Sequence, residues 1–285
     1  MTFKHLPHWF KVNINRGKNF RRIDSLVSNL QLNTVCKEAG CPNKWECWNR
    51  GTATFIILGD LCTRGCRFCG VDKGTPTGVD REEAGRITEA VNTLKLTYAV
   101  ITSVTRDDLE DGGAALFAGV VYKIRNACPE CRVELLVPDF KGIPEALYKV
   151  VDSKPSVLGH NIETVSRLYP KVRPQAVYKR SLDLLYLAKK RDDRVITKSG
   201  LIIGFGEKIE EIIQTMKDLS GVGCDILTIG QYLRPSKGHI PIERFYAPEE
   251  FQELEITGQG MGFLSVKAGP LVRSSYRADE LMAGL

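Results

Sequence analysis

The chain has 285 residues, of which 43% are hydrophobic and 26% charged, and its formal net charge is +6. This length and composition predict one barrel-sized domain with extensions, rather than two equal domains. No apolar run approaches the length needed to cross a bilayer, and the first 22 residues lack the continuous apolar core of a secretory signal. We therefore expect a cytoplasmic protein without membrane contact.

Positive charge is concentrated at the N-terminus. Residues 1–22 contain no acidic residue and carry Lys4, Lys11, Arg16, Lys18, Arg21 and Arg22. These charges equal the net excess of the whole chain, so the remainder is close to balanced. Such an arm is typical of proteins that bind an acidic partner or nucleic acid, or that carry an organelle-targeting signal. A solvated extension accounts for it equally well.

Nine cysteines are many for a chain of this size, and six of them lie within residues 36–69. Their odd number, without a secretory signal, favours metal binding in a reducing compartment over a disulfide scaffold. The first three, Cys36, Cys41 and Cys47, follow the spacing C-x4-C-x5-C in a turn-rich loop. Thiolates are soft ligands that suit iron–sulfur clusters and zinc. Trp45 and Trp48 either shield such a cluster from water or anchor the core.

After residue 50, short apolar runs alternate with amphipathic segments. The predicted strands are Thr54–Leu58, Tyr98–Val104, Val133–Val137, Ser156–Gly159, Thr197–Phe205 and Asp225–Tyr232. The predicted helices lie near Arg81–Leu94, Gly113–Ala127, Pro144–Val151, Ile162–Leu168, Leu182–Lys190 and Lys208–Leu219. Six such units predict an α/β fold, a partial (β/α)6 TIM-like barrel with N- and C-terminal extensions. A doubly wound open sheet is the alternative, and both folds place the active site at the C-terminal ends of the strands.

The second cysteine triplet follows the first predicted strand directly. It reads C-x3-C-x2-C and consists of Cys62, Cys66 and Cys69. Three thiolates in one loop can hold three irons of a four-iron cube and leave the fourth iron open to a ligand. A closed zinc site that borrows Cys47 is the alternative, although no histidine sits at a matching spacing. Cys128 and Cys131 have the spacing of a redox or zinc half-site but no partner pair, so ordinary cysteines at a helix end are the favoured interpretation, and Cys224 is expected to be a core residue.

Three parts of the chain are therefore expected. Residues 1–50 form an N-terminal extension with the first triplet, and residues 51–246 form the barrel. Residues 247–285 form a C-terminal extension, which begins with a helix from Pro248 and contains a short strand at Phe263–Val266.

The second triplet, with an aromatic residue before its last cysteine, resembles the signature of the radical S-adenosylmethionine (SAM) superfamily. With the first triplet before it, the chain resembles the lipoyl synthase family. Further blocks that resemble this family are Thr102-Ser-Val-Thr-Arg-Asp-Asp-Leu-Glu-Asp-Gly-Gly113, His160-Asn-Ile-Glu-Thr164, Gly200-Leu-Ile-Ile-Gly204, Gln231-Tyr-Leu-Arg-Pro235 and Arg273-Ser-Ser-Tyr276. Together they span about residues 33–277.

The resemblance implies two [4Fe–4S] clusters and SAM as cofactors. It implies that Cys62, Cys66 and Cys69 hold the cluster that cleaves SAM, and that the cluster on Cys36, Cys41 and Cys47 donates sulfur. Two sulfurs enter C6 and C8 of a protein-bound octanoyl-lysine, and each insertion uses one SAM. The family takes the fourth ligand of the donor cluster from a serine, here expected to be Ser275 rather than Ser274.

Further site residues follow from the matching blocks. SAM is expected to contact Asp111, Gly112 and Gly113, and also Thr102, Asn161, Glu163 and Arg234. A helix cap is the structural alternative for Asp111 and for Asn161, and a surface ion pair is the alternative for Arg234.

The expected partners are an octanoylated lipoyl carrier protein and an electron donor such as ferredoxin or flavodoxin. The carrier is expected to be a lipoyl domain of a 2-oxoacid dehydrogenase or the glycine cleavage H protein. Two other functions remain open: a biotin-synthase-like sulfur inserter acting on a free small molecule, and a zinc module that binds nucleic acid. The second of these requires a basic face across the domain, whereas the charge lies in the arm.

Overall fold

The computed structural model describes residues 6–283, and their eight strands form one sheet in chain order. The strands are β1 Asn33–Thr34, β2 Thr54–Ile57, β3 Tyr98–Ser103, β4 Arg132–Leu136, β5 Val157–Gly159, β6 Ile196–Ile203, β7 Ile226–Gln231 and β8 Ser265–Gly269. Strands β2 to β8 pair in parallel, and β1 pairs antiparallel with β2. Sequential order excludes the doubly wound alternative, in which the strand order reverses. The predicted partial barrel is confirmed.

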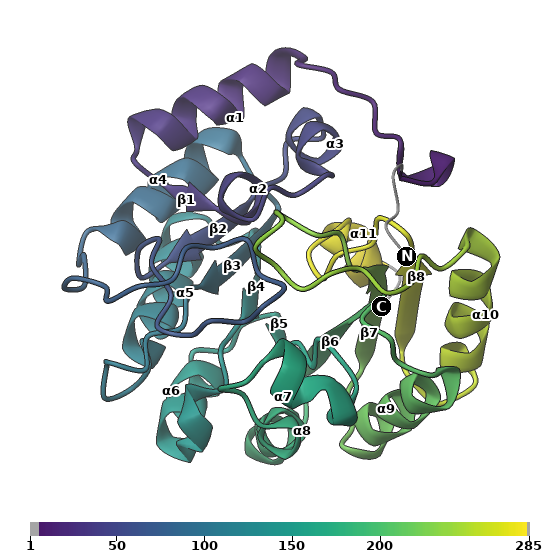
Figure 1. Ribbon diagram of the computed structural model, residues 1–285. Helices are drawn as coiled ribbons and strands as arrows, with labels where there is room; N and C mark the ends of the chain where they lie inside the picture. The colour runs from purple at the N-terminus through teal and green to yellow at the C-terminus, as the bar shows by residue number, and fades with distance from the viewer. Residues whose placement is uncertain (1–5, 284–285) are drawn as a thin grey trace.

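Helices follow the strands and cover the outer face of the sheet, as Figure 1 shows. They are α4 Glu83–Leu94, α5 Ala114–Ala127, α6 Pro144–Asp152, α8 Tyr178–Arg191, α9 Ile209–Gly221 and α10 Pro248–Gln259. In α4, for example, Ala84, Ile87 and Val91 are buried, which is the spacing of one helical face. Among the described residues, no helix is long and apolar enough to span a membrane.

All six predicted strands are present, and α10 with β8 adds a further parallel unit from the region predicted as the C-terminal extension. The helix predicted near Ile162–Leu168 is wrong over its first half. There, Glu163 pairs with Leu201 of β6 in an isolated bridge, at a φ of 64°. Its amide and carbonyl bond to Gly200 and Ile202, so pairing with the sheet replaces helical bonding. Only η3 Ser166–Leu168 and the short α7 Tyr169–Val172 follow.

The N-terminal part lies along the side where the sheet is open (Figure 1). It contains η1 His8–Phe10, α1 Lys18–Asn29, α2 Val35–Glu38 and α3 Lys44–Asn49. Phe20 of α1 packs on Trp45 and Trp48 of α3, with ring centroids 5.0 and 5.1 Å apart. Trp48 is completely buried. The tryptophans therefore anchor the helix that carries Cys47.

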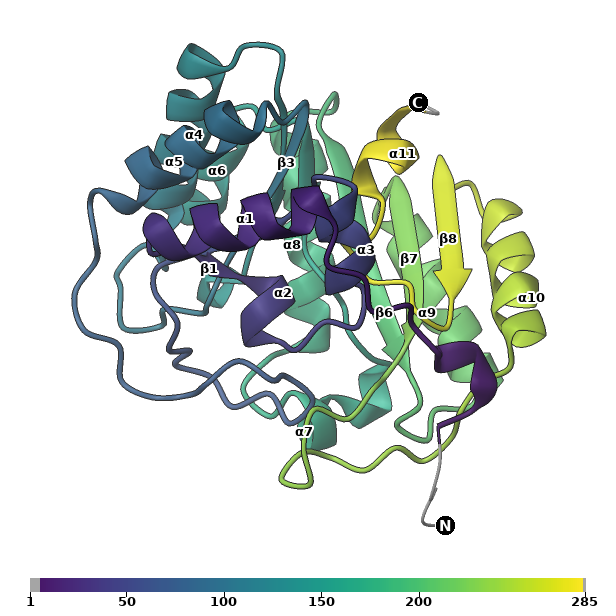
Figure 2. The same ribbon diagram turned by 90° about the horizontal axis from the view of Figure 1, so that it is seen from above.

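The chain after β8 turns back into the barrel. Gly230 of β7 faces this segment so closely that a Cβ on it would lie 2.0 Å from the carbonyl oxygen of Val272. Further on, Ala278 packs on Tyr98 and Val100 of β3. Figures 1 and 2 show the last helix, α11 Ala278–Ala283, within the ring of strands and at the end opposite α7.

The barrel interior also contains a buried polar chain near the N-terminal ends of the strands. Lys198 of β6 donates to both carboxylate oxygens of Glu134 on β4, at 2.9 and 3.0 Å. The hydroxyl of Tyr98 donates to the same carboxylate at 2.6 Å. Lys198 and Glu134 are each 2% exposed. Paired in this way, neither charge is left alone in a low-dielectric interior.

Two candidate cysteine sites

The second triplet lies in the loop between β2 and α4, at the C-terminal end of β2. The loop folds back on itself, because the Cys62 amide donates to the Asp72 carbonyl at 2.8 Å and the Gly74 amide donates to the Cys62 carbonyl at 3.0 Å. The Cys62 thiol accepts from the amides of Arg64 and Thr105, each at 3.4 Å. Two backbone donors therefore fix the position of this sulfur.

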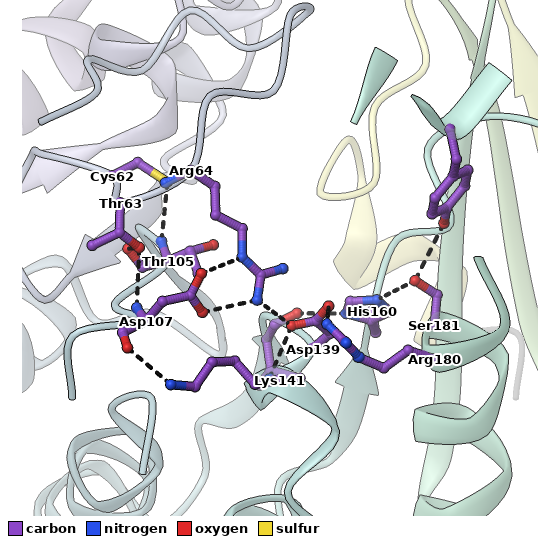
Figure 3. A network of polar contacts seen from close by, with 12 residues as sticks. Cys62, Thr63, Arg64, Thr105, Asp107, Asp139, Lys141, His160, Arg180 and Ser181 are labelled. Carbon is purple, nitrogen blue, oxygen red and sulfur yellow. Dashed lines mark hydrogen bonds and ion pairs between the residues drawn. The ribbon is translucent and has the colours of Figure 1, made fainter. Parts of the chain in front are cut away.

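Arg64 anchors this loop to two neighbouring strand ends (Figure 3). Its Nε donates to Asp107 at 2.6 Å and its Nη2 donates to Asp139 at 2.6 Å. Asp139 is 2% exposed and also accepts from Arg180. Burial opposes the charge on Asp139, but the Arg64 guanidinium outweighs it and holds the pKa of that carboxyl well below its usual range. Bidentate arginine contacts are geometrically specific, so they fix the path of the loop.

The thiols of this loop lie close enough to act on one another. Burial raises the pKa of the Cys69 thiol to about 12, and the nearby Cys66 and Cys62 contribute to the increase. Burial also raises the pKa of Cys66, while the positive charge of Arg173 opposes this and Glu163 adds to it. Metal binding displaces thiol protons, so iron would overcome these shifts.

Two polar atoms near Cys66 have no protein partner. Asn161 Oδ1 and Arg173 Nε are buried and unbonded. Other atoms of both residues are bonded within the protein: Asn161 Nδ2 donates to Glu163 at 3.0 Å, and Arg173 Nη1 donates to the Asn161 carbonyl at 3.0 Å. Unpaired buried polar atoms are costly, so they favour a polar ligand at this position.

The structure brings Asn161 and Glu163 to the second triplet, but it gives other predicted SAM residues structural contacts. Both oxygens of Asp111 accept from amides at the start of α5, those of Gly113 at 2.9 Å and Ala115 at 2.8 Å. Asp111 therefore bonds to the first turn of α5, whose N-cap is Gly113, as the structural alternative anticipated in part. Gly112 and Gly113, with φ of 59° and 90°, form the turn that precedes α5.

Thr102 and Arg234 also bond within the protein. The Thr102 hydroxyl donates to the Leu136 carbonyl at 2.8 Å. Arg234 is exposed and donates to the carbonyls of Lys237 and His239 in its own loop. The His239 ring in turn hydrogen-bonds to the Cys69 carbonyl at 2.9 Å. Contact of these residues, and of Asp111, Gly112 and Gly113, with SAM stays a prediction.

The first triplet comes together in one pocket. Cys36 lies in α2, Cys41 in the following loop and Cys47 in α3, and all three line the pocket with Ser275. Burial raises the pKa of Cys36 to about 11 and that of Cys47 to about 12, and the thiols reinforce each other. Burial also raises the pKa of Cys41, against the positive charge of Arg273.

The two serines of Arg273-Ser-Ser-Tyr276 have different surroundings. Ser275 lines the pocket of the first triplet, whereas Ser274 accepts a hydrogen bond from Asn161 Nδ2 at 3.4 Å. This separation favours Ser275 over Ser274 as a fourth ligand beside the three thiols.

The ligand groups have a geometry that bears on the kind of metal. Among residues 6–283, no three His, Cys, Asp or Glu side chains converge on one point as the ligands of a single ion do. In a four-iron cube each thiolate binds a different iron, so cluster ligands lie farther apart. Cys131 and Cys224 belong to neither triplet and are buried, at 8% and 3% exposure.

Comparison with known proteins identifies the family. The sequence profile of the Radical SAM superfamily matches residues 56–219, and that of the N-terminal domain of lipoyl synthase matches residues 2–41. The lipoyl synthase of Caldicellulosiruptor saccharolyticus is 52% identical over 96% of this chain and 96% of its own length. That of Rubrobacter xylanophilus is 53% identical, over 96% and 85%.

The chain belongs to the lipoyl synthase family. It is a radical SAM sulfurtransferase, and membership implies a [4Fe–4S] cluster and SAM. Solved structures support the fold alone: methylornithine synthase (PylB) is 14% identical, with a TM-score of 0.54 over 78% of this chain and 73% of its own. SuiB of Streptococcus suis is 12% identical, with a TM-score of 0.58 over 88% and 53%.

Several residues of this lipoyl synthase family member were not predicted as site residues. Arg173 lies beside Cys66, yet it follows the short α7 with no motif around it. Asp139 holds Arg64 but is far from the triplet in sequence. Arg64 itself lies inside the second triplet. Its position between two predicted ligands was the one feature of the sequence that could have indicated its role.

Proposed function

We propose that the protein inserts two sulfur atoms, at C6 and C8, into an octanoyl chain that is amide-linked to a lysine of a carrier protein. In this proposal, Cys36, Cys41, Cys47 and Ser275 hold a second [4Fe–4S] cluster, which is the sulfur donor and hence a substrate. Cys62, Cys66 and Cys69 hold the resident cluster. When bound, that cluster and SAM supply a 5′-deoxyadenosyl radical, which removes hydrogen from an unactivated C–H bond.

The observation that carries the proposal is the pocket that Ser275 shares with Cys36, Cys41 and Cys47. Three thiols, of which Cys36 is buried and Cys41 and Cys47 are half-buried, and a hydroxyl from the other end of the chain match the ligand set that the family resemblance implies. A hydroxyl oxygen is a harder ligand than a thiolate, and iron–sulfur clusters favour soft ligands. One weak ligand suits a cluster that has to give up sulfur.

The SAM site in this proposal lies beside Cys66 and uses the chain's own polar atoms. The methionine part of SAM carries an amino group, which is a donor, and a carboxylate, which is an acceptor. Asn161 Oδ1 is an unbonded acceptor and Arg173 Nε is an unbonded donor, so they match these two groups. Glu163, held at its position by Asn161 and by β6, adds a negative charge for the amino group.

Partners and location follow from the same proposal. The octanoyl group is delivered by an octanoylated carrier protein, such as a lipoyl domain or the glycine cleavage H protein, and a ferredoxin or flavodoxin supplies electrons. Nine free cysteines suit a reducing compartment, and we propose the cytoplasm. The proposal includes neither nucleic acid nor a membrane as a partner.

The test is to purify the protein without oxygen and count iron and sulfide. About eight irons per chain are expected for two clusters. Incubation with SAM, a reductant and an octanoyl-lysine peptide should then place sulfur on the peptide. Wild-type protein with about four irons, or with zinc, would contradict the proposal.

Cysteine variants assign the two sites. Cys47→Ala should retain about four irons and still cleave SAM, but it should insert no sulfur. Cys69→Ala should lose SAM cleavage. Cys224→Ala is the control, because this buried cysteine lies outside both sites and should retain both clusters. Sulfur insertion by the Cys47→Ala variant would contradict the role of the first triplet.

A further inference from the structure

The chain after Ser275 is fastened to the helix that carries Cys47. The Tyr276 hydroxyl donates to both carboxylate oxygens of Glu46, at 3.0 and 3.1 Å. Arg277 donates to the same carboxylate through Nη2 at 2.7 Å and Nε at 3.1 Å. Four donor contacts therefore converge on one acidic side chain of α3.

Three further contacts flank this one along both segments. Before Ser275, the Asn43 side chain donates to the Leu271 carbonyl at 2.6 Å, and Asn43 is only 4% exposed. After it, Arg50 pairs with Glu280 at 2.5 Å and with Asp279 at 3.6 Å. The C-terminal segment is thus held against residues 43–50 on both sides of Ser275.

The positions of these residues connect the contacts to the ligands. Glu46 directly precedes Cys47, and Tyr276 directly follows Ser275. A contact between the two neighbours therefore fixes the thiol and the hydroxyl relative to each other, although they come from opposite ends of the chain.

We propose that Glu46 is a positioning residue that holds Ser275 at the pocket of the first triplet. The inference rests on the proposed function, in which Ser275 binds an iron of the sulfur-donor cluster. Oxygen binds such iron less well than a thiolate does, so the hydroxyl depends on being held in place. Glu46 supplies that restraint through charge-assisted bonds to Arg277 and a bond from Tyr276.

The experiment compares wild-type holoenzyme with Glu46→Gln, which keeps the side-chain shape and removes the charge. The first measurement is the rate at which a chelator removes iron, and we expect about a tenfold increase for one of the two clusters. The second is the Mössbauer signature of the iron that has an oxygen ligand, which should weaken in the variant. SAM cleavage without carrier depends on the other cluster and should not change.

Asp152→Asn is the matched control. Asp152 pairs with Arg191 through two bonds, at 2.8 and 2.7 Å, away from both cysteine sites. The exposure of that pair, 49% and 45%, resembles the 41% and 43% of Glu46 and Arg277. The control variant should release iron at the wild-type rate.

The outcomes separate the inference from the function on which it rests. Wild-type iron release and an unchanged signature in Glu46→Gln overturn the inference and leave the proposed function standing. A wild-type protein with a single cluster overturns both. If Glu46→Gln loses both clusters through misfolding, Tyr276→Phe decides, because it removes one hydroxyl: faster loss from one cluster supports the inference, and unchanged loss overturns it.

Discussion

Gly230 of β7 lies against the returning C-terminal segment with no room for a side chain. A Cβ on Gly230 would come 2.0 Å from the carbonyl oxygen of Val272 and 3.0 Å from its carbonyl carbon. Both are backbone atoms, so no side-chain rotation relieves the overlap. Overpacking of a core costs about 1–3 kcal/mol, and we expect Gly230→Ala to reach about 3 kcal/mol. We also expect the displaced segment to move Ser275 out of its pocket.

Thermal unfolding and iron content measure the two effects. A loss of about 3 kcal/mol corresponds to a decrease in Tm of roughly 6–12 °C for a chain of this size. Iron content should decrease from about eight towards about four per chain. Gly119→Ala is the control: this glycine lies inside α5 with nothing within 4 Å of a Cβ, so alanine should stabilise the protein by about 0.5–1 kcal/mol. A Gly230→Ala variant with wild-type Tm and iron content would refute the position of the segment.

Other contacts give three further predictions. Burial lowers the pKa of His160 from 6.5 to about 4. As pH falls from about 6.5 to 4, the imidazole is therefore protonated in the unfolded chain but not in the folded one, and stability decreases. Denaturant titrations should show up to about 3 kcal/mol of this loss in wild type and none in His160→Gln. Arg64→Lys cannot contact Asp107 and Asp139 together, and should destabilise the protein by about 2 kcal/mol in the same assay. Lys198→Met should cost about 3–5 kcal/mol by leaving the Glu134 charge unpaired, and a second change, Glu134→Gln, should recover part of it; no recovery would contradict the ion pair.

Local patterns in the sequence were enough for the strands and for the cysteine triplets. Apolar runs predict burial in a parallel sheet, and closely spaced cysteines predict thiols that lie together, because both depend on residues close in the chain. The helix predicted from Ile162 was wrong because Glu163 pairs with β6, and pairing between distant segments overrides local helical preference. Asp111 bonds to the first turn of α5, a contact that the local pattern allowed beside the favoured contact with SAM.

Contacts between distant segments could not be predicted from spacing. Nothing near Glu46 indicates that it faces Tyr276, and nothing near Arg64 indicates Asp139. Ser275 was inferred through the family resemblance, because a serine in a short polar stretch has no pattern of its own. Its position beside Cys36, Cys41 and Cys47 depends on how the chain turns back after β8.

The proposed reaction requires the radical source and the sulfur donor to lie close together, because a carbon radical has to react with sulfur before it reacts with another group. The C-terminal segment contacts residues of both cysteine sites. Ser275 lines the pocket of the first triplet, while its neighbour Ser274 accepts from Asn161 at 3.4 Å. Asn161 also donates to Glu163, whose charge acts on Cys66 of the second triplet. Adjacent serines therefore link the pocket of the first triplet to Asn161, and a contact that holds Ser275 also restrains Ser274.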